Sequence, residues 1–149
     1  MASVMPTRSW EPRESRLLGE WILANYPGDR VVYRARLGPN TDQPIYKSVS
    51  RYADALVFTG SEVLIIEAKL DSYLGAIAQL EFYSQLFKQT PEYSDYWTAP
   101  IKLILLVARV TEDLIVYANS KGIQVVLYFP SWVQDYFTDR IQKYRHVTS

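Results

Sequence analysis

The sequence predicts an α/β domain in which helices flank a central mixed sheet. Three observations lead to this fold class. Segments with helical and strand-like periodicity follow one another in the order αβββαβαβα, which is typical of helices packed on a sheet. Residues 63–66 are all apolar, as in a strand that is buried on both faces. Gly60-Ser61 separates two strand-like segments, so we expect these strands to form a hairpin.

The N-terminal segments predict a tail, a helix and a strand. Residues 1–9 are expected to form a loose tail. A helix is expected from about Pro12 to Tyr26, where apolar side chains recur at helical spacing. The alternating residues 30–37 predict a half-exposed strand, followed by a loop over residues 38–44. One face of that strand is expected to carry Val31, Tyr33, Ala35 and Leu37.

The remaining segments complete the predicted order. Strands are expected over residues 51–58 and 62–70, with Gly60-Ser61 at the two central positions of a type II′ turn. A helix is expected from about Ser72 to Gln89, because Asp71-Ser72 provides residues that favour a helix start. The later elements are a loop over 90–100, a strand over 101–107, a helix over 111–119, a strand over 124–129 and a helix over 131–144.

Length and composition restrict the function classes. A chain of 149 residues with 48% hydrophobic residues is expected to form one domain over residues 1–149. Cysteine is absent and His146 is the only histidine, which argues against thiolate zinc sites, cysteine nucleophiles and a Ser-His-Asp triad. The apolar run over residues 103–108 is too short for a membrane span. We therefore expect a cytoplasmic protein with no membrane partner.

The charge pattern leaves two interpretations open. Net charge is zero, with 16 basic and 16 acidic residues, so the strongly basic field of a non-specific DNA binder is missing. Residues 27–52 nevertheless hold a local basic excess. This excess indicates either a solvated face or a basic surface beside an acidic centre, as in a phosphate-binding enzyme that holds metal.

The hairpin places two carboxylates opposite each other. A two-residue turn at Gly60-Ser61 pairs Asp54 with Glu67 across the two strands. Opposed residues have Cβ atoms about 4.5–5.5 Å apart on one face, and two carboxylates at that distance resist joint ionisation unless a cation lies between them. Lys69 lies two residues after Glu67 and so shares its face. This pattern predicts a site for a hard divalent cation such as magnesium, with an ammonium group beside it.

The same charged residues allow a structural interpretation. Glu67 and Lys69 interrupt an otherwise apolar strand, and burying them without partners would cost several kcal/mol. They therefore form either an ion pair at the sheet edge or a chemical site.

These residues resemble a known nuclease family. Arg51-Tyr52-Ala53-Asp54, followed by Glu67-Ala68-Lys69, is similar to the core motif of the PD-(D/E)XK superfamily. The resemblance implies a restriction-endonuclease-like αβββαβ core over about residues 12–107, with a C-terminal αβα elaboration over 108–145. It further implies that Asp54 and Glu67 bind Mg²⁺ or Mn²⁺, and that Lys69 positions the attacking water and stabilises charge on the phosphate. Ala53 stands where the family name has proline.

Further residues extend the resemblance. Glu20 lies in the first helix, where many members place an acid that reaches the metal; its alternative role is that of a solvated helix residue. Gln79 and Tyr83 share a helix face and resemble the Gln-x-x-x-Tyr signature of the RecB-like branch; otherwise they are ordinary polar positions. The residues expected to bind the nucleic-acid backbone are Arg30, Arg34, Arg36 and Arg51, together with Tyr83.

The resemblance implies a metal-dependent nuclease that hydrolyses DNA phosphodiester bonds. The alternative is a catalytically silent protein that keeps the nuclease fold and serves a larger complex as an assembly or DNA-binding component. A charged trio that is only an ion-pair network is the third interpretation. DNA is the expected partner, a recruiting protein is a second one, and the sequence leaves a homo-oligomer open. Tyr93, Tyr96 and Trp97 are expected to pack as a lid over the core rather than to stack on bases.

Overall fold

The computed structural model describes residues 12–39, 51–71 and 73–148, with side chains described as far as residue 142. The expected tail over residues 1–9, residues 40–44 of the expected loop, Ser72 and the side chain of His146 lie outside these residues. The elements in chain order are α1 Pro12–Asn25, β1 Arg30–Leu37, β2 Arg51–Phe58, β3 Val63–Asp71, α3 Leu74–Phe87, the 3₁₀ helix η1 Pro91–Tyr96, β4 Ile101–Arg109, α4 Glu112–Ser120, β5 Ile123–Leu127 and α5 Ser131–Thr148.

The predicted α/β class and the order of elements are confirmed. Each expected helix and strand is present, with ends shifted by a few residues, and the expected loop over residues 90–100 contains η1. The start of α3 differs from the prediction. Asp71 belongs to β3 and its carboxylate binds Arg109 of β4, while Tyr73 precedes α3 without a side-chain cap. No helix in the described part of the chain is long and apolar enough to cross a membrane.

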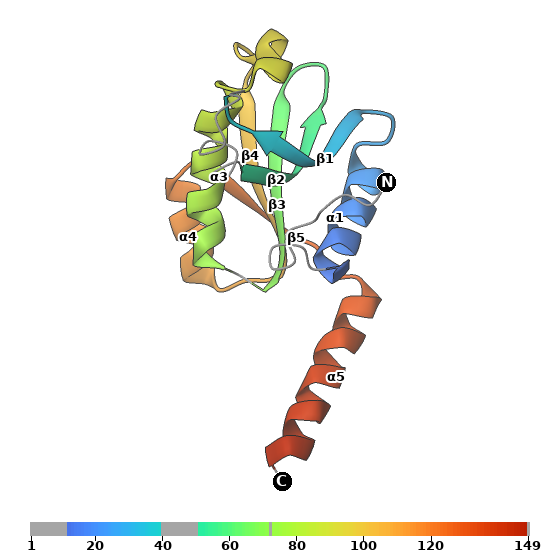
Figure 1. Cartoon of the computed structure of the whole chain (residues 1–149). Helices are drawn as coiled ribbons and strands as arrows, with labels where there is room; N and C mark the ends of the chain where they lie inside the picture. Colours follow the sequence, from blue (N-terminus) through green and yellow to red (C-terminus); the bar gives the residue numbers. More distant parts are fainter. Residues whose placement is uncertain (1–11, 40–50, 72, 149) are drawn as a thin grey trace.

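The five strands form one mixed sheet in the order β1-β2-β3-β4-β5. β1, β2 and β3 are antiparallel neighbours, whereas β3, β4 and β5 run parallel. α3 and α4 lie on one side of the sheet and α1 lies on the other (Figure 1). β3 is the central strand and is covered on both faces, which explains its apolar sequence.

Two hydrophobic clusters separate the faces of the sheet. The α3 face includes Ile65 and Leu105 packed with Ile77 and Leu80 of α3. The α1 face includes the remaining alternate strand residues packed with α1 and with the first turns of α5. Glu67 and Lys69 alternate in step with Ile65, so they point toward the α3 side.

The β2–β3 turn fixes the predicted register. The N–H of Thr59 donates to the carbonyl of Glu62 over 3.0 Å, and Gly60 has a φ of 92°, as its place in a type II′ turn requires. The pairs from Phe58↔Val63 to Ala55↔Ile66 follow the predicted register. Backbone pairing ends at Ala55↔Ile66, one position before the two carboxylates.

β1 turns over at Arg34. This residue has a φ of 49° and is alone among the described non-glycine residues in having a positive φ. Val31 packs on the α1 face, whereas Ala35 and Leu37 pack on the α3 face. The prediction that these three share one face is therefore wrong, because alternation holds only while every residue is extended.

β2 changes face at the neighbouring position. Ala53 packs on the α3 face and Ala55 packs on the α1 face, so the change occurs at Asp54. The flanking pairs Tyr33↔Ala55 and Ala35↔Ala53 enclose this point in the β1–β2 ladder. Both strands thus rotate together beside the predicted acidic site.

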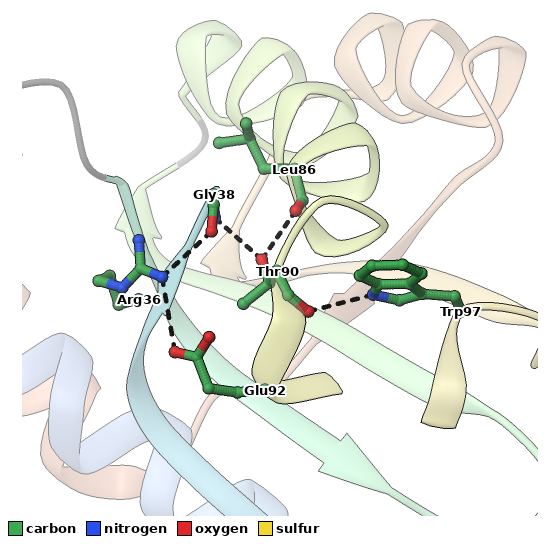
Figure 2. A network of polar contacts seen from close by, with 6 residues as sticks. All are labelled: Arg36, Gly38, Leu86, Thr90, Glu92 and Trp97. Carbon is green, nitrogen blue, oxygen red and sulfur yellow. Dashed lines mark hydrogen bonds and ion pairs between the residues drawn. The ribbon is translucent and has the colours of Figure 1, made fainter. Parts of the chain in front are cut away.

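The aromatic segment around η1 covers one end of the core, as predicted. Tyr93 is buried between Phe58 and Phe87, while Tyr96 and Trp97 pack partly buried against the same cluster. Thr90 anchors the segment: its hydroxyl accepts a bond from the N–H of Gly38 and donates to the carbonyl of Leu86, and its carbonyl accepts from Trp97 (Figure 2).

Candidate active site

The side chains of Asp54 and Glu67 each accept a hydrogen bond from the opposite strand where β2 and β3 separate. The backbone N–H of Asp54 donates to Oε1 of Glu67 over 3.0 Å. The backbone N–H of Ala68 donates to Oδ2 of Asp54 over 2.9 Å. Each carboxylate therefore replaces a carbonyl of the interrupted ladder. The reciprocal bonds hold the two acids side by side in one orientation.

The acid pair carries more negative charge than its surroundings balance. Glu67 is 3% exposed, and Asp54 is half-buried. Burial and the neighbouring Asp54 charge raise the pKa of Glu67 well above its usual value, although Lys69 opposes this. Burial also raises the pKa of Asp54, against the N–H of Ala68 and the charge of Lys69. Such a pair favours a bound cation, because a cation between the acids offsets their mutual repulsion and the cost of burying their charge.

The donor set fits a magnesium-like ion. Within the described residues, the second oxygens of the pair, Oδ1 of Asp54 and Oε2 of Glu67, accept no hydrogen bond from the protein. No cluster of three or more His, Cys, Asp or Glu ligands occurs in that part of the chain. Magnesium commonly takes one or two carboxylates and completes its shell with water and substrate phosphate, so two carboxylates suffice.

Lys69 is held at the end of β3 by an aromatic ring. Its Nζ lies 5.4 Å from the ring centroid of Tyr73, and its charge lowers the pKa of both acids. The Tyr73 ring lies against Gly75, where an added Cβ would come within 2.6 Å of that ring. Tyr73 was not identified from the sequence as a site residue. Its position four residues after Lys69 is the sequence feature that could have indicated it.

α3 contributes Tyr83 to the same region. Burial and the charges of Glu67 and Asp54 raise the pKa of Tyr83, while Arg51 opposes them. Tyr83 thus keeps its hydroxyl proton beside the acids. Gln79 lies one turn earlier on α3, and its Oε1 is buried without a hydrogen-bond partner among the residues that the structure describes. A buried unsatisfied oxygen is costly, which marks Gln79 as unusual in this fold.

Glu20 does not join the pair. Its carboxylate accepts hydrogen bonds from Arg16 at 3.0 Å, from the indole of Trp132 at 2.9 Å and from the hydroxyl of Tyr128 at 3.3 Å. The contacts with Trp132 and Tyr128 connect α1 to the start of α5 and to the segment before it. The bond from Trp132, with the help of Arg16, lowers the pKa of Glu20. The expectation that Glu20 reaches the metal is therefore corrected.

Glu14 is the acid of α1 that approaches the pair. Its Oε2 accepts the backbone N–H of Leu70 over 3.0 Å, and its charge contributes to the raised pKa of Glu67. The sequence could not distinguish Glu14 from Glu20, because the distinction depends on how α1 docks against β3.

The four candidate arginines fall into two groups. Arg34 is close enough to Asp54 to lower its pKa, and Arg51 acts in the same way on Tyr83. Arg30 instead lies 4.7 Å from the ring centroid of Phe58, at the far end of β1. Arg36 binds the carbonyl of Gly38 and the carboxylate of Glu92 (Figure 2). Of the four, Arg34 and Arg51 are the arginines whose charges act on residues of the candidate site.

Comparisons with known proteins place this fold beside endonucleases. No protein-family model matches the sequence, and no curated protein matches it. A repair endonuclease from Pyrococcus abyssi aligns with a TM-score of 0.52 and 17% identity over 87% of this chain and 50% of that chain. An EndoMS-dsDNA2 complex aligns with a TM-score of 0.52 and 16% identity over 87% of this chain and 49% of that chain. The likeness is one of fold.

This chain spans about half the length of each matched protein. The mixed α/β sheet flanked by helices is thus an arrangement that endonucleases adopt.

Proposed function

We propose that this protein is a metal-dependent nuclease that hydrolyses phosphodiester bonds of DNA. The observation that carries the proposal is the interlocked pair of Asp54 and Glu67, with Lys69 beside it, at the point where two strands separate. Mg²⁺ or Mn²⁺ is the proposed cofactor, because hard divalent ions prefer carboxylate oxygens. The likeness in fold to two endonucleases supports the assignment as a nuclease but does not bear on the metal.

Each residue of the site has a distinct task. Asp54 and Glu67 would hold the ion through their second oxygens, while their bonds to backbone N–H groups fix the orientation of both carboxylates. When bound, the ion would supply a positive charge that polarises the phosphate and lowers the pKa of a water molecule. Lys69 would donate a hydrogen bond to the attacking water or to a phosphate oxygen, and it would offset negative charge that develops during the reaction.

The α3 residues provide neutral contacts. Because Tyr83 keeps its proton, its hydroxyl can donate to a phosphate oxygen near the acids. The side chain of Gln79 supplies a second polar contact whose oxygen has no partner inside the described protein. We assign these two residues to substrate positioning, in the manner of the RecB-like branch. Arg34 and Arg51 are the arginines placed to bind backbone phosphates.

The test is cleavage of DNA by the purified protein. Linear, circular and single-stranded DNA are incubated in Mg²⁺ or Mn²⁺, with EDTA as the metal-free control and Lys69→Ala as the control for a contaminating nuclease. Cleavage that requires metal and Lys69 supports the proposal. Absence of cleavage of every substrate in either metal would overturn it and favour the catalytically silent assembly protein.

A partner protein is part of the proposal. The chain has zero net charge, so its electrostatic attraction to DNA is expected to be weak. We infer that a second protein or domain brings it to DNA.

A further inference from the structure

Three exposed aromatic side chains, each beside a cation, come from the segments that carry the candidate site. Tyr52 is 42% exposed and Tyr73 is 52% exposed, with Arg34 and Lys69 at 5.6 Å and 5.4 Å from the respective ring centroids. Phe82 is 44% exposed, and the guanidinium of Arg51 lies 5.9 Å from its ring centroid.

Each pair is connected to the site through its cation. The charges of Arg34 and Lys69 both act on Asp54. Arg51 acts on Tyr83, which in turn responds to Glu67 and Asp54. By position in the chain, Tyr52 lies two residues before Asp54 on β2, Tyr73 lies four residues after Lys69, and Phe82 lies next to Tyr83 on α3. We call Tyr52, Tyr73 and Phe82 the aromatic rim.

Exposed aromatic rings beside cations suit one type of ligand. Base-paired DNA offers phosphates but hides the faces of its bases, whereas a single strand offers both. Rings that stack on bases, next to cations that contact phosphates, are the usual means of binding single strands without sequence preference. Zero net charge gives the protein no broad electrostatic attraction to either form, so the stacking contacts are what would favour the single strand.

We propose that the aromatic rim binds unpaired nucleotides and makes single-stranded DNA the preferred substrate form. This inference rests on the proposed function for the cleavage step, although binding itself does not require cleavage. Bases stack on Tyr52, Tyr73 and Phe82, and the neighbouring cations contact the phosphates. The strand is thereby guided past Asp54 and Glu67.

Binding is measured by fluorescence anisotropy in EDTA, so that no strand is cut. The probes are a labelled thymidine oligonucleotide, a duplex of equal length and a uridine oligonucleotide, all at one salt concentration. The variants Tyr52→Leu, Tyr73→Leu and Phe82→Leu remove a stacking surface while keeping an apolar side chain. Each should weaken binding to the thymidine oligonucleotide about 5- to 100-fold, as expected for one stacked base, and leave the duplex unchanged.

Tyr117→Leu is the matched control. Tyr117 is 45% exposed on α4 and has Nζ of Lys121 at 5.7 Å from its ring centroid. The charge of Lys121 is not among those that shift the pKa of Asp54 or Glu67. Replacement of Tyr117 should leave single-strand binding unchanged.

Several outcomes would overturn the proposal. These are equal or tighter binding of the duplex, binding to neither DNA form, and an equal loss in the Tyr117→Leu control. Binding to neither form would indicate that the rim contacts a protein, and tighter binding of the uridine strand would replace DNA by RNA. Metal-dependent cleavage without single-strand preference would contradict this inference and leave the nuclease proposal standing. Single-strand binding without cleavage would contradict the nuclease proposal and leave this inference standing.

Discussion

Removing one charge of the acid pair should stabilise the metal-free protein. Asp54→Asn keeps an oxygen that accepts the N–H of Ala68 but removes one of two like charges. Two charges about 5 Å apart, as in an opposed strand pair, repel by about 3 kcal/mol at an effective dielectric constant of 20. Lys69 and Arg34 offset part of this repulsion, so we expect a gain of about 1–2 kcal/mol. For a domain of this size the gain raises Tm by about 2–8 °C.

The pH dependence has a definite sign. The folded-state pKa of Glu67 lies above its unfolded value, so the folded state binds the proton more tightly. The contribution of Glu67 to the stability of the metal-free protein is therefore fully present below the ordinary glutamate pKa and is lost as pH rises through the folded-state pKa of Glu67. In Asp54→Asn this fall should be smaller, because the charge of Asp54 is one cause of the shift.

The assay needs thermal melts of wild type and Asp54→Asn, each in EDTA and in Mg²⁺ at fixed ionic strength. Magnesium at a hundredfold excess over Kd should stabilise wild type by about 2.7 kcal/mol and the variant by much less. Asp71→Asn is the control on the same strand, since its carboxylate is already paired with Arg109 and its loss should not raise Tm. If magnesium leaves wild type unchanged and Asp54→Asn melts no higher in EDTA, the two acids share no cation site.

Three further predictions follow from the same structure. Lys69→Ala should lower the cleavage rate by at least about 100-fold while calorimetry finds Mg²⁺ affinity nearly unchanged, whereas Glu67→Gln should weaken Mg²⁺ binding; the reverse pattern would exchange their roles. Arg34→Gly should have a free energy of unfolding about 1 kcal/mol higher than that of Arg34→Ala, because both variants lose the charge but only glycine tolerates a φ of 49°. Equal stability of the two variants in thermal melts would show that the backbone is not strained. Glu20→Gln should lower stability by about 1 kcal/mol and leave the cleavage rate unchanged, so a lost cleavage rate at full stability would return Glu20 to the metal site.

The sequence predicted those parts of the molecule that depend on local rules. The period of β3 and the two-residue turn placed Asp54 opposite Glu67, because both are set by residues within one hairpin. Tyr93 was expected to pack down, since an aromatic residue beside an apolar core loses its exposed area by doing so. The α/β class followed from the order of elements in the same way.

Other parts depend on contacts between distant segments and could not be predicted. Glu14 and Glu20 look alike along the helix, and only the docking of α1 separates them. The turn of β1 at Arg34 has no local sequence signal, because arginine is not a residue that favours a positive φ. Arg36 was expected to bind DNA, but the fold supplies it with Glu92 from a segment far along the chain.

The reciprocal bonds of Asp54 and Glu67 also bear on how this site could lose its activity. Because the acids serve as the last rungs of the β2–β3 ladder, their replacement by alanine would leave two backbone N–H groups without acceptors, at about 1–3 kcal/mol each. Asparagine and glutamine would keep both rungs and abolish the charge. Homologues that lost the catalytic activity but kept the fold should therefore carry amide side chains at these two positions, not small apolar residues. An amide pair there would identify a protein that descends from an active enzyme.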